Sequence, residues 1–392
     1  MHGPQSVLET GKVFKDLGAR RCLVVTDKGV RRAGLIDGVL RSLKESDIPY
    51  VVFDDVEEDP SGATVGRGAD LAVKNKCDGI VVVGGGSPIC AGRGIGVVVN
   101  NGGHIRDYEG LNKASKPPLP LIAIPTTAGS GAEVSQFIIL RDEDRQMRMV
   151  AGSPLYFPKW AILDPMLLKT LSPWQFTVSG VDALAHAIEA YLTTMTTPIT
   201  DALALSSVKL IHDNLRAAAT SDDLDAKEAC LIGSTMANMA CGNARLGLVH
   251  ALTSPMESLY EIPHGVAVGT FLPYVMEFNL PASQHRFATL AKCMGQCNRS
   301  GSSGDVAGGA VLAVKKLYID LSFPRKYSTS QVDRKSIPQM VTMAMTGLYG
   351  KSKASEEYPL NRILSSVNIR KATMQDAIDL LEKAFEGWEL PK

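Results

Sequence analysis

The first 170 residues alternate between short apolar runs and longer amphipathic stretches. The apolar runs are rich in β-branched residues, as is typical of buried strands, and they cover residues 22–26, 50–53, 79–83 and 121–124. Between them, apolar residues recur at three- and four-residue spacing, which predicts helices over residues 30–46, 62–76 and 88–99. Because the strand runs are almost wholly apolar, we expect a parallel sheet with helices on both faces.

The pattern changes after Asp164-Pro165. Ser172-Pro173 is typical of a helix start, with serine as N-cap and proline at the first helical position. Beyond it, alanine- and leucine-rich stretches predict helices over residues 173–193, 198–218, 225–242, 267–279, 283–296, 304–320 and 374–387. We therefore predict an α/β domain over residues 1–170 and an all-α domain over residues 171–392, with a cleft between them.

Composition and charge narrow the class of partner. A length of 392 residues suits two domains, and 41 Lys and Arg residues balance 41 Asp and Glu residues, so no basic field favours nucleic acid or anionic lipid. No apolar stretch approaches the roughly 18 residues that span a bilayer, and no secretory signal is recognisable at the start. Seven scattered cysteines without a CxxC pair suit free thiols in a reducing compartment. We expect a cytoplasmic protein that acts on a small molecule and involves neither nucleic acid nor membrane.

A glycine-rich turn is the first candidate binding feature. Gly84-Gly85-Gly86-Ser87 runs from a predicted strand into a predicted helix, where free N–H groups and the helix dipole favour a phosphate. Alone, such a cluster is equally compatible with a tight strand–helix turn. Thr126, Thr127 and Ser130 follow another predicted strand, and Asp27 ends the first one. All of these residues lie at carboxyl ends of strands, where ligands of open α/β sheets bind.

The order of these features differs from the ordinary Rossmann fingerprint. There the glycine loop follows the first strand and an acidic residue comes later, whereas here Asp27 precedes Gly84. We therefore expect another dinucleotide-binding topology, in which Asp27 accepts a hydrogen bond from the adenosine ribose. Its negative charge disfavours a 2′-phosphate and so favours NAD(H) over NADP(H).

A second candidate site combines one aspartate and three histidines. Asp182 and His186 share a face of a predicted helix, a pairing that suits either a divalent metal or a simple intrahelical hydrogen bond. His250 stands in an apolar context in which a lone histidine is usually a core residue. His264 lies between Pro263 and Gly265, a flexible glycine expected to redirect the side chain. One carboxylate and three imidazoles suit Fe²⁺ or Zn²⁺ and are poor ligands for Mg²⁺ or Ca²⁺.

Taken together, these motifs resemble the iron-containing (group III) alcohol dehydrogenase family, of the same superfamily as glycerol dehydrogenase and dehydroquinate synthase. The likeness extends over nearly the whole chain. Its sharpest motifs are residues 84–88, 125–134, 182–190 and 263–265. It implies a dehydroquinate synthase-like fold, with an α/β dinucleotide-binding domain and an all-α metal-binding, catalytic domain.

The resemblance also implies specific ligands. Asp182, His186, His250 and His264 would bind the catalytic metal, commonly iron, and would act in catalysis through it. Gly85, Gly86 and Ser87 would hold the pyrophosphate and Gly84 would also contact the cofactor, while Thr126, Thr127 and Ser130 would line the cofactor site. Arg148 stands where relatives often carry a lysine near the nicotinamide ribose.

Four positions depart from the family pattern. Cys90 and Arg93 replace a frequent aspartate and lysine after the glycine turn, and Asp59 replaces a frequent asparagine. Ser254 stands where many relatives carry a further histidine, so a proton relay through that imidazole is not available. The hydroxyacid–oxoacid transhydrogenase branch also lacks this histidine, a resemblance that favours an acid-bearing substrate.

The function expected from these features is reversible, NAD(H)- and metal-dependent interconversion of a small alcohol or hydroxyacid-type substrate and an aldehyde or ketone. A homo-oligomer, dimeric or larger, is also expected. Two alternatives stay open: a metal-dependent lyase or cyclase related to dehydroquinate synthase, and a catalytically silent member of the family.

Overall fold

The computed structural model describes residues 1–145, 147–296, 303–346 and 360–390. The chain divides into two compact units, Met1–Leu171 and Ser172–Lys392. In the described residues, no helix has both the length and the apolar character that a membrane crossing needs.

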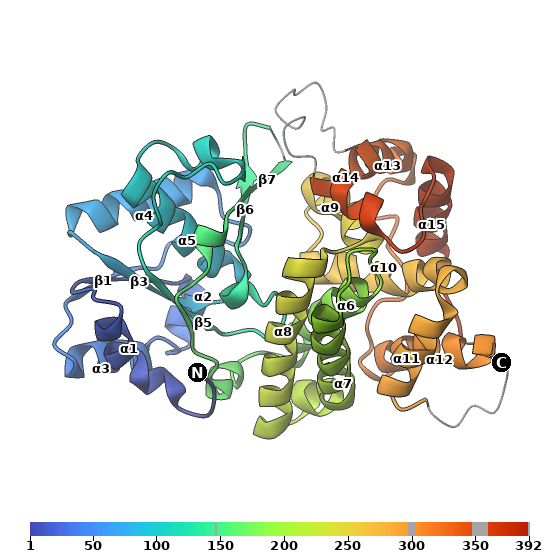
Figure 1. Ribbon diagram of the computed structural model, residues 1–392, viewed down its shortest axis with the longest axis horizontal. Helices are drawn as coiled ribbons and strands as arrows, with labels where there is room; N and C mark the ends of the chain where they lie inside the picture. The colour runs from blue at the N-terminus through green and yellow to red at the C-terminus, as the bar shows by residue number, and fades with distance from the viewer. Residues whose placement is uncertain (146, 297–302, 347–359, 391–392) are drawn as a thin grey trace. The chain divides into compact units, whose positions relative to one another are not determined.

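The N-terminal unit is built on a parallel sheet with strand order β2-β1-β3-β5-β8 (Figure 1). Its strands are β1 (Cys22–Val25), β2 (Tyr50–Phe53), β3 (Gly79–Gly84), β5 (Leu121–Pro125) and β8 (Trp160–Ala161). The sequence-predicted strands are therefore confirmed to within a residue. A smaller sheet, of order β4-β7-β6, contains β4 (Gly110–Leu111), β6 (Phe137–Asp142) and β7 (Met147–Gly152). The strand order reverses between β1 and β3, so the carboxyl ends of these two strands form the switch point at which ligands bind.

Helices cover both faces of the larger sheet. They are α1 (Thr10–Asp16), α2 (Lys28–Arg32), α3 (Asp37–Glu45), α4 (Gly62–Lys74) and α5 (Gly86–Asn101). Short 3₁₀ turns are η1 (Ser6–Glu9), η2 (Ile105–Tyr108), η3 (Ala132–Val134), η4 (Pro154–Tyr156) and η5 (Pro165–Leu168). The single helix predicted over residues 30–46 was wrong, because Gly34 adopts a positive φ of 73° and separates α2 from α3.

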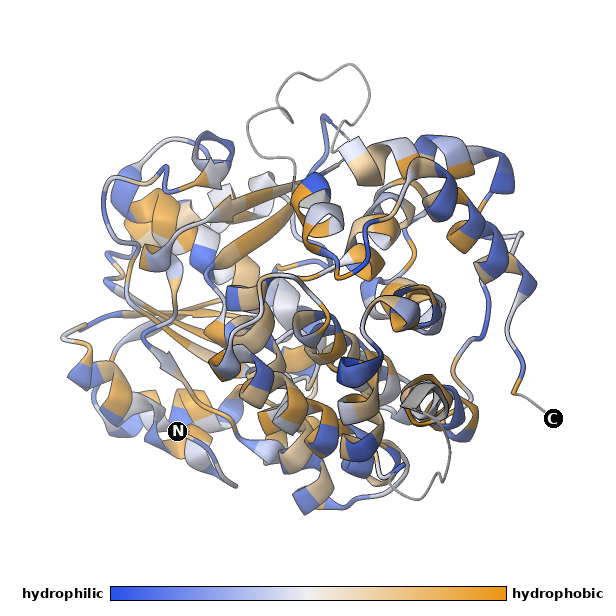
Figure 2. Ribbon diagram, turned by 45° about the vertical axis from the view of Figure 1, so that its right-hand side comes forward, coloured by the Kyte–Doolittle hydropathy of each residue, from blue (hydrophilic) through white to orange (hydrophobic). Residues whose placement is uncertain are grey.

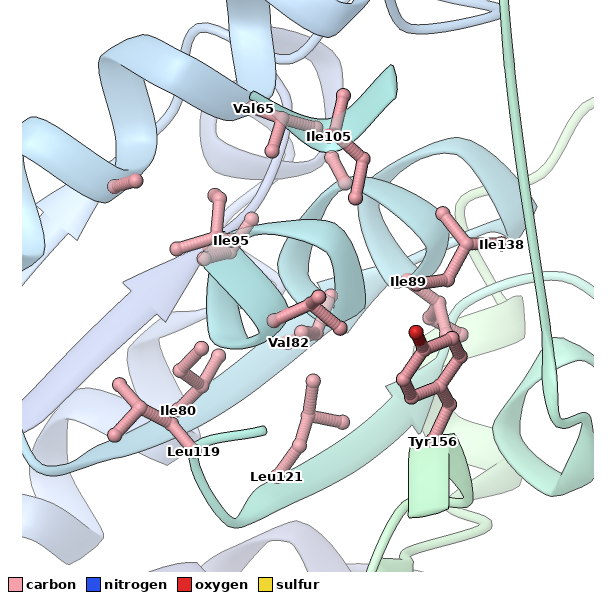
Figure 3. Packing of buried hydrophobic residues seen from close by; sticks show 14 of the residues in the cluster. Val65, Ile80, Val82, Ile89, Ile95, Ile105, Leu119, Leu121, Ile138 and Tyr156 are labelled. Carbon is pink, nitrogen blue, oxygen red and sulfur yellow. The ribbon is translucent and has the colours of Figure 1, made fainter. Parts of the chain in front are cut away.

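Alternate residues of β1, β3 and β5 enter two different cores, as the two-residue period of a strand requires. Val82 and Leu121 pack with Ile95 of α5 and Val65 of α4 on one face (Figure 3). Val81 and Ile124 point the opposite way, and they pack with α1 and α3 on the other face. In Figure 2 the strands are coloured hydrophobic along much of their length. This burial on both sides explains why the strands read as continuous apolar runs.

In the described residues of the C-terminal unit, the regular elements are all helices. Its helices are α6 (Pro173–Tyr191), α7 (Pro198–Thr220), α8 (Leu224–Ala244), α9 (Leu248–Tyr260), α10 (His264–Asn279), α11 (Gln284–Cys293), α12 (Ser303–Asp320), α13 (Ile337–Thr346), α14 (Leu360–Val367) and α15 (Met374–Glu386), with η6 (Leu280–Ala282) and η7 (Arg334–Ser336). Ser172 and Gln175 form the capping box at the start of α6, and Pro173 occupies its first turn as predicted. The predicted fold class, an α/β domain followed by an all-α domain, is confirmed.

Helix α9 was not predicted from the sequence. Pro255 lies inside it, and a proline in a helical pattern normally marks an end. The apolar residues Leu248, Leu252 and Met256, each fully buried at four-residue spacing, were the available helical signal. The omission matters because His250 belongs to this helix.

Candidate functional site

Helix α6 carries a polar stripe on an otherwise apolar surface. Asp182, His186 and Glu189 lie four and three residues apart, which places them on one face of the helix. The residues between them, including Leu184 and Ile188, are completely buried. The stripe is buried too, so its charges and ring nitrogens must find partners inside the protein.

Three helices bring the four predicted metal ligands together. Asp182 and His186 come from α6, His250 from the first turn of α9, and His264 is the first residue of α10. One ligand atom from each residue lies within 4.8 Å of the others. Asp182 Oδ1 is 3.4 Å from His264 Nε2 and 3.9 Å from His186 Nε2.

Asp182 and His250 each contribute one polar atom that, within the described residues, lacks a hydrogen-bond partner. These atoms are Asp182 Oδ1 and His250 Nε2, and both are buried. A buried polar atom without a partner costs about 1–3 kcal/mol, and a bound ion or water can supply the partner. A divalent cation fits this donor set, because carboxylate oxygen and imidazole nitrogen are ligands of Fe²⁺ and Zn²⁺.

The electrostatics of the cluster keep His186 neutral. Burial lowers the pKa of His186 to about 4; Asp182 opposes this shift, and the neighbouring His250 and His264 add to it. The neutral imidazole is the form that binds a metal ion.

Close helix packing sets the position of His264. Pro263 is the N-cap of α10, and Gly265 lies in the first turn of the helix. A Cβ atom on Gly265 would lie 2.8 Å from the carbonyl oxygen of Val178 in α6. The expectation of a flexible glycine was wrong: Gly265 is there because α10 approaches α6 too closely for a side chain.

The glycine turn of the N-terminal unit lies against the second predicted segment. Strand β3 ends at Gly84, Gly85 is the N-cap, and α5 begins at Gly86. A Cβ atom on Gly85 would lie 3.4 Å from the Thr127 side chain. A Cβ atom on Gly86 would lie 3.3 Å from Ser130 Oγ. The neighbouring residue, Thr126, donates its backbone N–H to the carbonyl of Gly84 at 3.1 Å. The structure therefore brings these predicted cofactor-binding residues together at the end of β3.

Ser87 and Arg148 meet through Asp59. The backbone N–H of Asp59 donates to Ser87 Oγ at 3.2 Å, and the Asp59 carboxylate pairs with Arg148 Nε at 3.2 Å. Asp59 adopts a positive φ of 52°, which aspartate tolerates better than most residues. Asp59 thus compensates the charge of Arg148 beside the glycine turn.

Asp27 lies at the end of β1 and caps α2. Its Oδ1 accepts the backbone N–H of Val30 at 2.8 Å, and within the described residues Oδ2 has no further hydrogen-bond partner. The next residue, Lys28, lines a depression of about 410 Å³ together with Arg31, Arg32 and Asp54. Asp27 therefore has a structural function, and one carboxylate oxygen remains for a ligand.

The departures at Cys90 and Arg93 have structural explanations. Cys90 is partly buried and packs against the apolar core of the sheet. Arg93 is fully buried and donates to the backbone carbonyls of Ala132, at 2.5 Å, and Phe137. Arg93 thus holds the segment that follows Ser130, and burial lowers the pKa of its guanidinium.

Two glutamates of this region were missed by sequence reasoning. Glu189 contacts His250 Nδ1, and Glu257 contacts His264 Nδ1. Acidic residues within predicted helices are normally exposed, and only their burial sets these two apart. Ser254, one helical turn after His250, is half-buried, and its carbonyl accepts Ser258 Oγ at 3.1 Å.

Comparisons with known proteins agree on one family. The family model described as iron-containing alcohol dehydrogenase matches residues 1–165, and that of the Fe-containing alcohol dehydrogenase family, C-terminal, matches residues 176–385. The chain is 37% identical to a 1,3-propanediol dehydrogenase from Citrobacter freundii, over 88% of this chain and 89% of that protein. It is 33% identical to an NAD-dependent methanol dehydrogenase from Bacillus methanolicus, over 98% of this chain and 97% of that protein.

A solved structure supports the same assignment. A crystal structure of a 1,3-propanediol oxidoreductase is 34% identical, with a TM-score of 0.92 over 98% of this chain and 97% of that one. The chain thus belongs to the iron-containing alcohol dehydrogenase family, as its motifs implied, and is an oxidoreductase of alcohols and aldehydes.

Proposed function

We propose that this protein interconverts a small alcohol and the corresponding aldehyde or ketone, using NAD(H) and a divalent cation held by Asp182, His186, His250 and His264. The observation that carries the proposal is the convergence of these four residues from three helices to within 4.8 Å. Nitrogen and oxygen donors admit Fe²⁺ and Zn²⁺, and the family favours Fe²⁺.

The cofactor side of the proposal rests on the N-terminal unit. Gly84, Gly85, Gly86 and Ser87 would hold the pyrophosphate at the start of α5, with Thr126, Thr127, Ser130 and Arg148 beside them. Asp27 would accept a hydrogen bond from the adenosine ribose through its remaining oxygen and would repel a 2′-phosphate. NAD(H) is therefore preferred to NADP(H), and one relative carries NAD dependence in its name.

When bound, the cation would polarise the substrate oxygen, and the nicotinamide ring would exchange a hydride with the substrate carbon. Burial keeps His186 neutral, which is the form that binds a metal ion. Ser254 is a poor base, so a proton would leave the substrate oxygen through water or a ribose hydroxyl rather than through this side chain.

Charge around the proposed metal site favours an uncharged substrate. Asp182, Glu189 and Glu257 are buried carboxylates, whose three negative charges exceed the two positive charges of the cation. A carboxylated or sulfonated substrate would have to overcome this excess, since charges interact strongly away from water. This consideration opposes the acid-bearing substrate that Ser254 suggested.

The test is a panel of aldehydes. Protein loaded with Fe²⁺ or Zn²⁺ would be mixed with NADH and simple aldehydes, semialdehydes and carboxylated or sulfonated aldehydes in parallel, and NADH oxidation followed. Turnover of uncharged aldehydes is expected. If no member of the panel is reduced although metal is bound, the dehydrogenase proposal fails, and the cyclase and silent alternatives take its place. The cytoplasmic location and the homo-oligomer stay predictions.

A further inference from the structure

Two buried carboxylates contact two of the proposed metal ligands on the ring nitrogen that faces away from the cluster. We propose that Glu189 and Glu257 are positioning residues that fix which ring nitrogen of His250 and His264 faces the metal. The inference rests on the proposed metal site and adds the means by which that site is kept ready for a cation.

Glu189 holds two adjacent residues of α9. Its Oε2 lies 2.5 Å from His250 Nδ1, and its Oε1 accepts the backbone N–H of Val249 at 2.7 Å. The Glu189 side chain is only 5% exposed. On the other side of the ring, His250 Nε2 has no hydrogen-bond partner in the described residues. Both carboxylate oxygens are thus engaged by the first turn of α9.

Glu257 repeats the arrangement on His264. Its Oε1 lies 2.8 Å from His264 Nδ1, and its side chain is 2% exposed. The opposite nitrogen, His264 Nε2, points to the cluster and lies 3.4 Å from Asp182 Oδ1. In both pairs a carboxylate holds Nδ1 and leaves Nε2 for the cluster.

The chemistry of the pairs determines the tautomer. A neutral imidazole carries one hydrogen, and an ionised carboxylate only accepts hydrogen bonds. The hydrogen therefore lies on Nδ1, and the lone pair lies on Nε2, where a metal ligand needs it.

Packing shows that the Glu189 pair is built into the helix start. Gly247, the residue before α9, has no side chain to cap the helix, and a Cβ atom there would lie 3.0 Å from Glu189 Oε1. Asn368 Oδ1 accepts the N–H of Leu248 at 3.4 Å. Groups distant in the sequence therefore cap α9 in place of its own side chain, and one of them also orients His250.

His186 provides an internal contrast. Its Nδ1 is buried without a hydrogen-bond partner in the described residues, so no carboxylate fixes its tautomer. Among the three histidines of the cluster, glutamates therefore orient His250 and His264 but not His186.

Glu189→Gln and Glu257→Gln test the inference because glutamine keeps the shape and removes one acceptor. In Glu189→Gln the amide NH₂ must face either the N–H of Val249 or His250 Nδ1. Facing Nδ1, it donates and moves the imidazole hydrogen to Nε2, the atom meant for the metal. Zn²⁺ affinity, measured by competition with a chromophoric chelator, should fall about 10- to 100-fold in each variant. Glu386→Gln, at an exposed position of α15, is the matched control and should leave the affinity unchanged.

A double-mutant cycle separates positioning from a general effect on the fold. In a His250→Ala background, Glu189→Gln should cause no further loss of Zn²⁺ affinity, because its effect passes through the missing ring. An equal loss in both backgrounds would overturn the inference, as would Zn²⁺ affinities of both glutamine variants within twofold of the wild type.

The outcomes distinguish the inference from the function on which it rests. If the wild-type protein binds neither Zn²⁺ nor Co²⁺, the proposed metal site is wrong. If the wild type binds both and the folded variants bind equally well with the same Co²⁺ absorption spectrum, only the positioning inference is wrong. Circular dichroism checks folding, and should one glutamine variant not fold, the other carries the test.

Discussion

The imidazole rings of His186 and His250 stack, with centroids 4.8 Å apart and an angle of 20° between the planes. A positive charge on His250 at this distance would oppose protonation of His186, and burial of His186 opposes it more strongly. The pKa of His186, about 4, follows mainly from this burial. His186 thus presents neutral nitrogen at neutral pH.

A pH dependence of stability follows for the metal-free protein. Below pH 6.5 the unfolded chain binds a proton on His186, whereas the folded chain does so only below about pH 4. The free energy of unfolding should therefore fall as the pH is lowered from about 6.5 to 4, with this group contributing about 3 kcal/mol. Urea unfolding across this range should show a smaller fall for His186→Gln. Parallel curves for the two proteins would contradict the assignment.

Loss of His264 should remove metal and activity together. His264→Ala deletes one of four ligands, and the remaining three hold a divalent cation much more weakly. Metal content by elemental analysis and NADH-dependent aldehyde reduction should both fall at least about 100-fold. His285→Ala, at an exposed position of α11, should change neither. A His264→Ala protein that kept its metal and its activity would show that the ligand set is wrong.

Cofactor preference should depend on the charge of Asp27. Asp27→Gly removes both the charge and the cap of α2, whereas Asp27→Asn keeps the cap, since asparagine is an equally good N-cap. In both variants the ratio of kcat/KM for NADPH to that for NADH should rise about tenfold or more, which corresponds to about 1.4 kcal/mol. An unchanged ratio would remove Asp27 from the ribose.

The close contact at Gly265 should be intolerant of a methyl group. In Gly265→Ala the new Cβ would lie 2.7 Å from Val178 Cγ1 and 2.8 Å from the Val178 carbonyl, so α10 must shift away from α6. We expect a loss of about 1–3 kcal/mol in the free energy of unfolding and weaker Zn²⁺ binding, because His264 moves with the helix. Gly242→Ala in α8 is the control, since its Cβ would approach only Asn238 Oδ1, at 3.8 Å. Equal stabilities of the two variants would count against the contact.

Arg93 should be required for stability. Arg93→Leu leaves the carbonyls of Ala132 and Phe137 without their buried donor, which costs about 1–3 kcal/mol for each group left unpaired. Thermal unfolding should therefore shift to lower temperature, and NADH affinity should fall because the segment after Ser130 loses its support. A Leu variant as stable as the wild type would contradict this account.

Much of the fold was determined by local pattern. Strands β1, β2, β3 and β5 are apolar runs, so their residues alone identify them, whereas the two-residue β8 was not predicted. The glycine turn follows from its place between β3 and α5. The capping box at Ser172 likewise marks the start of α6. These features depend on neighbours within a few residues, which the sequence displays directly.

The tertiary structure decided what depends on distant neighbours. Helix α9 forms despite Pro255, because its apolar face is buried and because Glu189 and Asn368 cap its first turn. The close approach of α10 to α6 requires Gly265, a contact that no local pattern reveals. Asp59 and Arg148 pair across 89 positions of sequence. The sequence by itself identified four residues able to hold a metal. Only the packing of α6, α9 and α10 brings one ligand atom of each to within 4.8 Å of the others, because the apolar faces of these helices are buried against one another.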